Sequence, residues 1–186
     1  MRDDLTRVIE AAVLDELAEA GYGRFSVGSV VRRAGVGKAA IYRRWATKQA
    51  MIVEVLAPRA VAAADGPDTG SLAGDIRAFV AATRHVLANP RVAATVLDLF
   101  AESLRNPELA EALRDHVTRP RRARVAQMLQ RAAGRGEIPA DIDTDAALDL
   151  LAGPFVVRAA LGSQAMDEAW GEEITPMLIR ALGGPA

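Results

Sequence analysis

The sequence predicts an all-α protein, and three observations support this fold class. Apolar residues recur every three or four positions along almost every segment, as they do on one face of an α-helix. No segment alternates apolar and polar residues in the manner of a half-buried strand. Short stretches rich in Gly, Pro, Asn and Asp, which cap or break helices, separate the segments.

The first two helices are predicted before residue 35. Apolar residues spaced three and four apart from residue 5 to residue 20 form a first amphipathic helix, which ends near Gly21 and Gly23. A second helix of about two turns follows Ser26, a residue type suited to the N-cap, and Gly35 ends it.

A short third helix follows "GVG", with Ile41 and Trp45 on its buried face because they lie four residues apart. Thr47 is a suitable N-cap for a fourth helix over about 48–62. The stretch "ADGPDTG" at 64–70 then has the composition of a linker.

The remaining segments are all helical in pattern. Asn106 and Pro107 form a strong helix start, because Asn caps a helix and Pro fits its first turn. Further helices are predicted from apolar stripes at 72–87, at Val92, Val96, Leu97, Phe100 and Leu104, at 125–132, at about 144–162 and at about 167–182.

Charge is unevenly distributed along the chain. The 186 residues are 51% hydrophobic and 25% charged with a formal net charge of −1, a balance that excludes a disordered chain. No carboxylate lies between Glu19 and Glu54, yet this window holds seven basic residues, namely Arg24, Arg32, Arg33, Lys38, Arg43, Arg44 and Lys48. The window is therefore expected to meet a negatively charged partner.

Several function classes are not expected. The chain has no cysteine, which excludes disulfides and thiolate metal sites and fits a cytoplasmic location. The start "MRDDLTRV" is unlike a signal peptide, and no apolar run approaches the roughly 18 residues that a membrane span needs. His85 and His116 fall in no zinc pattern and no catalytic motif is present, so we expect no enzyme, metal, cofactor or membrane partner.

The second and third helices, joined by a turn at Gly35, have the dimensions of a helix-turn-helix whose second helix enters the DNA major groove. At about 100° per residue, Ile41 and Trp45 point inward while Ala39 and Arg43 point away from the core. The outward face is thus small and basic.

Each outward residue type suits DNA. Arg43 can bind a guanine edge bidentately, Ala39 can touch a thymine methyl, and Lys38 and Tyr42 can hold phosphates. Lys48 adds charge beside the free N–H groups of the fourth helix. With the caps, the predicted DNA-binding residues are Ser26, Gly37, Lys38, Ala39, Tyr42, Arg43, Thr47 and Lys48.

The segment "FSVGSVVRRAGVGKAAIYRRWATKQAMI" resembles the DNA-binding region of the TetR (tetracycline-repressor) family of bacterial regulators. The resemblance rests on "AGV" in the turn, an aliphatic–Tyr pair, an aromatic residue three positions after that Tyr, and a Lys soon after. It assigns the helix-turn-helix core to Val30, Ala34, Gly35, Val36, Ile41 and Trp45.

The resemblance implies a helix-turn-helix DNA-binding domain over 1–50 and a helical effector-binding and dimerisation domain over 51–186. It also implies a homodimer on a palindromic double-stranded operator. The last two helices would form the dimer interface, for which we expect Leu148, Leu151, Phe155, Leu161, Ile174, Met177 and Leu178.

An unidentified small-molecule effector is a further implied partner. Its pocket is expected between about 51 and 135, with walls from Phe79, Thr83, His85, Phe100 and Met128. The second basic cluster, at 118–124, has acidic residues nearby and is expected to be a solvated or ion-paired surface.

Two alternatives to a ligand-released repressor remain open from the sequence. One is a helical interaction protein that keeps this fold without binding DNA. The other is an activator or a ligand-independent repressor.

Overall fold

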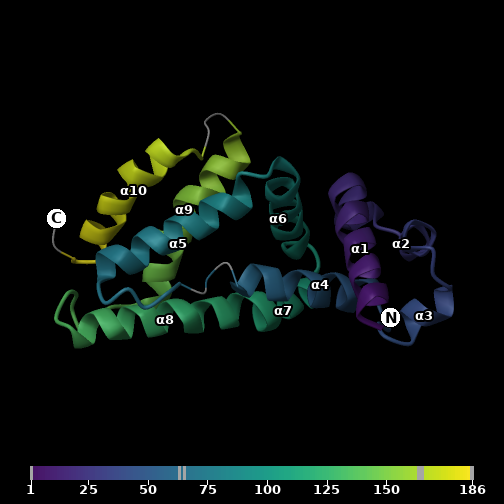
Figure 1. Ribbon diagram of the computed structural model, residues 1–186, viewed down its shortest axis with the longest axis horizontal. Helices are drawn as coiled ribbons and strands as arrows, with labels where there is room; N and C mark the ends of the chain where they lie inside the picture. The colour runs from purple at the N-terminus through teal and green to yellow at the C-terminus, as the bar shows by residue number, and fades with distance from the viewer. Residues whose placement is uncertain (1, 63, 65, 163–165, 185–186) are drawn as a thin grey trace.

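The computed structural model describes residues 2–62, 64, 66–162 and 166–184, and regular structure in these residues is helical throughout. The prediction of an all-α protein is confirmed. Within the same residues, no helix combines the length and apolarity that crossing a membrane requires. Figure 1 shows α1 to α3 at one end of the molecule, α5 and α8 to α10 at the other, and α4 and α6 between them.

The helices follow the predicted order. Their bounds are α1 (Arg2–Arg24), α2 (Val27–Ala34), α3 (Lys38–Tyr42), α4 (Lys48–Ala62), α5 (Leu72–Leu87), α6 (Pro90–Ser103), α7 (Pro107–Leu113), the π-helix η1 (Arg114–Thr118), α8 (Arg119–Gly134), α9 (Thr144–Leu161) and α10 (Glu168–Ala181).

The first helix is broken where the sequence predicted its end. Gly21 has φ 72° and ψ 168°, a conformation that residues with side chains rarely adopt, so the regular helix stops there and a short continuation runs to Arg24. This break turns the backbone of Tyr22 toward α6, whose Asp98 carboxylate accepts a hydrogen bond from the Tyr22 N–H at 2.6 Å.

The π-helix η1 was not predicted. It widens the chain between α7 and α8 immediately before Pro120. Proline has no N–H to donate to the carbonyl four residues earlier, here that of His116, so one regular helical hydrogen bond is missing at this point. The wider turn lets α7, η1 and α8 continue as one nearly continuous rod along α4 (Figure 1).

Two apolar cores stabilise the molecule. One lies among α1 to α4 and also takes in Leu99 from α6 and Leu109 from α7. The other lies among α5, α8, α9 and α10. At its centre the Phe155 ring meets Phe79 edge-on at 6.3 Å and Trp170 at 5.1 Å between ring centroids.

This second core corrects part of the predicted dimer interface. Leu148, Leu151, Phe155 and Leu178 are buried within a single chain, because α9 and α10 turn these side chains toward α5 and α8. Little or none of their surface is left for a partner chain. Ile174 is half-buried, whereas Leu161 and Met177 are exposed.

The predicted apolar stripe of α6 is also corrected. The buried positions are Ala93 and Leu99, whereas Phe100 is 49% exposed and Leu104 is 86% exposed. The reason is that α6 packs against α1 and α9, and Phe100 and Leu104 lie on the part of its surface that stays exposed.

Candidate nucleic-acid interface

The turn between α2 and α3 is set by the local backbone. Gly35 ends α2 with φ 64° and ψ 28°, the left-handed conformation that glycine adopts at low cost. The N–H of Val36 then donates to the carbonyl of Val31 at 3.3 Å. Gly37 holds an extended conformation ahead of the five residues of α3. The chain therefore reverses within three residues and starts α3 in a fixed direction.

The inner face of α3 is anchored in the first core. Val30 of α2, Ile41 of α3 and Trp45 just after it are each at most 2% exposed. The N–H of Trp45 donates to the carbonyl of Ile41 at 3.0 Å, so one further helical turn of backbone extends to Trp45. Ala34 and Val36 pack at the edge of the same cluster. This anchoring fixes which side of α3 meets solvent.

The outer face of α3 is exposed. Lys38, Ala39, Tyr42 and Arg43 all face solvent, with Tyr42 46% exposed. The Lys38 ammonium lies 5.6 Å from the centre of the Tyr42 ring. In the described part of the chain, the Arg43 side chain makes no hydrogen bond or ion pair, so its guanidinium is available to a ligand. The four side chains share one exposed face.

Five of the seven basic residues in the acid-free window make contacts inside the protein: Arg24 and Arg32 donate to Ala20 and Ser29 in their own helices, and three others connect one helix to another. Arg33 pairs with Glu16 at 3.2 Å and with Glu19. Arg44 donates to Thr6 at 2.8 Å and lies 4.6 Å above the Trp45 ring. These guanidiniums hold α2 and the end of α3 against α1.

The third of these residues is Lys48, for which a phosphate contact was predicted, and the structure corrects that prediction. Its ammonium donates to the Tyr22 carbonyl at 2.6 Å and lies 4.2 Å from the Tyr22 ring centre. Burial lowers the pKa of Lys48, and the carboxylates of Glu102 and Asp98 partly oppose that effect. The side chain therefore joins α4 to α1.

The two predicted N-caps behave differently. The Thr47 hydroxyl accepts from the Ala50 N–H at 3.0 Å and so caps α4. Ser26 occupies the N-cap position of α2, but its side chain makes no capping bond. Its backbone N–H instead donates to the carboxylate of Glu16 at 3.3 Å.

Sequence reasoning missed Glu16. It is only 5% exposed and connects α1 to both ends of α2, through the Ser26 N–H and the Arg33 guanidinium. A signal was present, because Glu16 lies three or four positions from Val13, Ala12 and Ala20 on the apolar side of the first helix. A carboxylate on that side requires a buried partner.

The predicted effector-pocket residues are divided. Phe79 and Met128 line one cavity of about 170 Å³ between α5 and α8. Thr83 is buried one turn further along α5, and its hydroxyl has no hydrogen-bond partner among the residues described. His85 and Phe100 are exposed and do not line this cavity, since α5 and α6 turn them toward solvent. Their assignment to its walls is corrected.

A recognition helix with a buried apolar side and an exposed basic side, held by a glycine turn, defines the class of helix-turn-helix DNA-binding proteins. Two family models match the chain. One describes bacterial regulatory proteins of the tetR family and matches residues 9–55, and the other describes a tetracyclin repressor-like C-terminal domain and matches residues 66–178. The chain belongs to the TetR family of DNA-binding transcription regulators.

Relatives and solved structures agree with this family. A DNA-binding transcriptional repressor TetR of Mycobacteroides abscessus is 31% identical over 174 residues, covering 91% of this chain and 89% of the relative. The regulator YdeS of Bacillus subtilis, itself uncharacterised, is 28% identical over 93% of this chain and 87% of its own. The crystal structure of the TetR-family regulator SCO0332 superposes with a TM-score of 0.75 at 25% identity, covering 98% of this chain and 99% of that one.

The buried position of Glu16 yields a stability prediction. Glu16→Gln removes the charge from a carboxylate that accepts two hydrogen bonds, and we expect it to lower the free energy of unfolding by about 1.5–3 kcal/mol. Urea unfolding followed by circular dichroism measures this change. Glu19→Gln is the matched control, because Glu19 is exposed and binds the same Arg33; equal losses in the two variants would contradict the role given to Glu16.

Proposed function

We propose that this protein is a homodimeric repressor that binds a palindromic operator and leaves it when a small-molecule effector binds. One observation supports DNA binding most directly. Arg43 is exposed and its side chain is unpaired, and it lies on α3, whose opposite side is anchored in the core by Ile41 and Trp45. The Mycobacteroides relative, which is named a repressor, supports repression over activation.

In this proposal residues 1–50 read DNA and residues 51–186 bind the effector and the partner chain. Arg43 reads a base edge, Ala39 lets α3 approach the groove, and Lys38 and Tyr42 hold phosphates together with Ser26, Gly37 and Thr47 at the helix starts. Two α3 helices about 34–36 Å apart reach successive major grooves. A protein that binds an operator on bacterial DNA functions in the cytoplasm.

Replacing Arg43 tests the reading face. We expect Arg43→Ala to weaken operator binding by about 5- to 150-fold, since one base contact is worth about 1–3 kcal/mol. Fluorescence anisotropy at several salt concentrations, on a palindrome selected from random duplexes, measures the effect. Arg77→Ala removes the same charge from an exposed site on α5 and should change little; equal weakening by both variants would mean that α3 does not read the operator.

The partner chain has a candidate docking face on α9 and α10. Leu150, Val157 and Leu161 are exposed on α9, and Met177 is exposed on α10. Positions 150, 157 and 161 differ by seven and four, so they share one side of α9, opposite the side that holds Phe155. An exposed apolar stripe on each chain provides the self-complementary surface that a two-fold dimer needs.

Introducing a charged residue into the exposed apolar stripe of α9 tests whether this surface forms the dimer interface. Val157→Asp leaves the protomer core intact, because Val157 is 57% exposed, but it would place an unpaired carboxylate in the interface. We expect the dimer dissociation constant to rise by at least about 100-fold, which is roughly 2.7 kcal/mol. Sedimentation velocity measures it, with Ala123→Asp on an exposed position of α8 as control. An unchanged dimer would exclude this face.

The proposed signal from effector to DNA passes through Tyr22. Its N–H is bound by Asp98 of α6 and its carbonyl by Lys48 of α4, each at 2.6 Å. A movement of α6 would therefore displace both α4 and the proposed DNA-binding domain, residues 1–50. By linkage, an effector that favours one arrangement of α6 lowers operator affinity by the same differential free energy.

Removing the Asp98 carboxylate tests this connection. In the wild-type protein, operator binding should slow hydrogen exchange in α6 as well as in α1 to α3. With Asp98→Ala we expect the slowing in α6 to be lost while operator binding remains, because the Tyr22 N–H no longer binds α6. Hydrogen-exchange mass spectrometry measures both regions, with Asp141→Ala, an exposed site, as control. Unchanged protection of α6 would contradict the route through Tyr22.

A further inference from the structure

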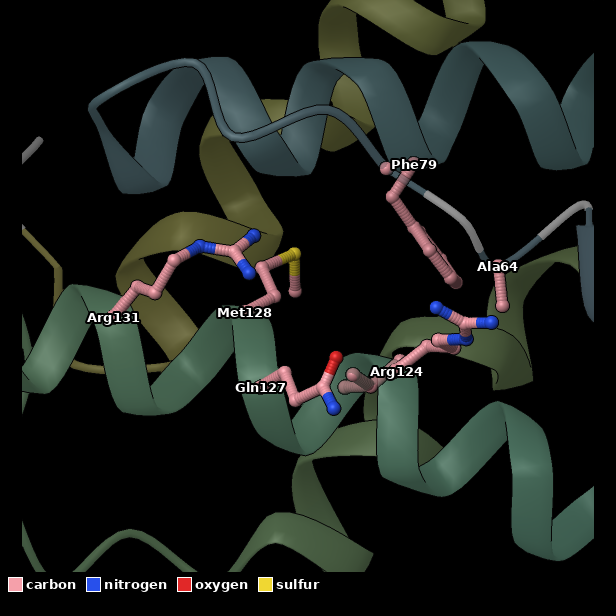
Figure 2. A pocket seen from close by; sticks show the side chains of 8 residues that line it. Ala64, Phe79, Arg124, Gln127, Met128 and Arg131 are labelled. Atoms are coloured by element: carbon pink, nitrogen blue, oxygen red, sulfur yellow. The ribbon is translucent and has the colours of Figure 1, made fainter.

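The cavity between α5 and α8 has walls that differ in chemistry. The smaller, apolar part of the wall comes from Phe79, Val125 and Met128, and Ala64 and Gly66 close the side toward α4. The polar side chains are Arg124, Gln127 and Arg131, which α8 presents along one face at intervals of three and four residues. Figure 2 shows the guanidiniums of Arg124 and Arg131 on either side of Met128, with the Gln127 amide directed into the same space.

The volume limits the size of a ligand. The cavity measures about 170 Å³. A cavity of about 150 Å³ in a protein core is known to hold a benzene molecule. An occupant of this cavity is therefore about the size of one six-membered ring that carries one small polar group.

The Arg131 guanidinium is incompletely bonded. Its Nε is buried without a hydrogen-bond partner in the part of the chain described. The carboxylate oxygens nearest to it are Asp68 Oδ2, 3.4 Å from Nε, and Asp75 Oδ2, 3.9 Å from Nη2, and neither contact has hydrogen-bond geometry. Asp75 is meanwhile held by Thr69, whose hydroxyl and N–H both donate to its Oδ1.

Arg135 also reaches Asp75 Oδ2, at 3.6 Å. The carboxylate of Asp75 thus keeps a positive neighbour when Arg131 moves. Because Arg131 is held only by long contacts, its planar guanidinium can turn and form a bidentate pair with a carboxylate placed in the cavity.

We propose that this cavity binds a small carboxylic acid with an apolar body of about one ring. The ligand carboxylate accepts hydrogen bonds from Arg131 and from the Gln127 amide, and the body packs against Phe79, Val125 and Met128. This inference rests on the proposed function, because it names the chemical class of the effector.

The position of the cavity also connects such a ligand to α4. Ala64 lies two residues beyond the end of α4 and is 7% exposed. Arg121 of α8 donates to the Ala60 carbonyl in the last turn of α4 at 2.6 Å. A ligand between Arg131 and Ala64 therefore contacts the segment that follows α4, and α4 is the helix that directly follows the helix-turn-helix.

Isothermal titration calorimetry with benzoate, on the full protein without DNA, tests the inference. We expect a dissociation constant near or below about 1 mM, and binding at least about 10-fold weaker for benzamide, which has the same shape without the charge. Arg131→Lys keeps the charge near Asp68 and Asp75 but removes the planar fork, and should weaken benzoate by at least about 10-fold. Arg122→Lys, whose guanidinium binds Asp145 and Asp149 of α9, is the matched control.

Gln127→Leu provides a second variant whose folding is not in question, since Gln127 is exposed on α8; it should weaken benzoate about 3- to 10-fold. No benzoate binding at about 10 mM, or equal binding of benzamide, would overturn the carboxylate inference. Operator binding is measured on the same samples, so this failure is separable from a failure of the regulator proposal. Benzoate binding that leaves operator affinity unchanged would count against the ligand as an effector.

Discussion

The backbone of Tyr22 is the constraint on which the arrangement of the two ends of the molecule depends. Its N–H binds a carboxylate of α6 and its carbonyl binds an ammonium of α4, each at 2.6 Å. Both bonds involve a charged group and are therefore stronger than neutral ones. The N–H is available to Asp98 because Gly21 leaves the helical conformation, whereas a continuous α1 would have bonded it within itself. The carbonyl lies in the last turn of α1, where helix carbonyls lack an α-helical partner.

The basic residues around this point serve two purposes. Arg33, Arg44 and Lys48 hold α1, α2 and α4 together, and each lies against a carboxylate, a carbonyl or an aromatic ring. Arg43 lies beside them in the sequence and faces solvent. The number of basic residues in a sequence window is therefore larger than the number available to a partner, because some of them are bonded within the protein and position the helix that carries the exposed ones.

The sequence predicted the helices well because their starts and stops are local. Gly21, Gly35, Thr47, Asn106 and Gly162 each act within one turn of chain, through backbone conformation or a capping bond. The inner face of α3 followed from spacing alone for the same reason.

The errors concern which side of a helix meets which neighbour. α9 carries apolar residues on several sides, so spacing could not decide whether Phe155 or Val157 belongs to the core. Phe100 and Lys48 were misplaced for a related reason. Sequence reasoning assigns an aromatic ring or a cation to a predicted site because it lies nearby in the sequence, whereas contacts between distant segments decide the direction of the side chain.

Whether the molecule can act as a switch depends on the size of the free energies involved. Moving a two-state equilibrium from 1:99 to 99:1 takes about 5.5 kcal/mol. A hydrogen bond to a charged group contributes about 1.5–3 kcal/mol, so the Asp98 and Lys48 bonds of one protomer supply about 3–6 kcal/mol. In the proposed homodimer the same pair occurs twice, and a change confined to Tyr22 is therefore large enough to couple an effector to the operator without any unfolding of either core.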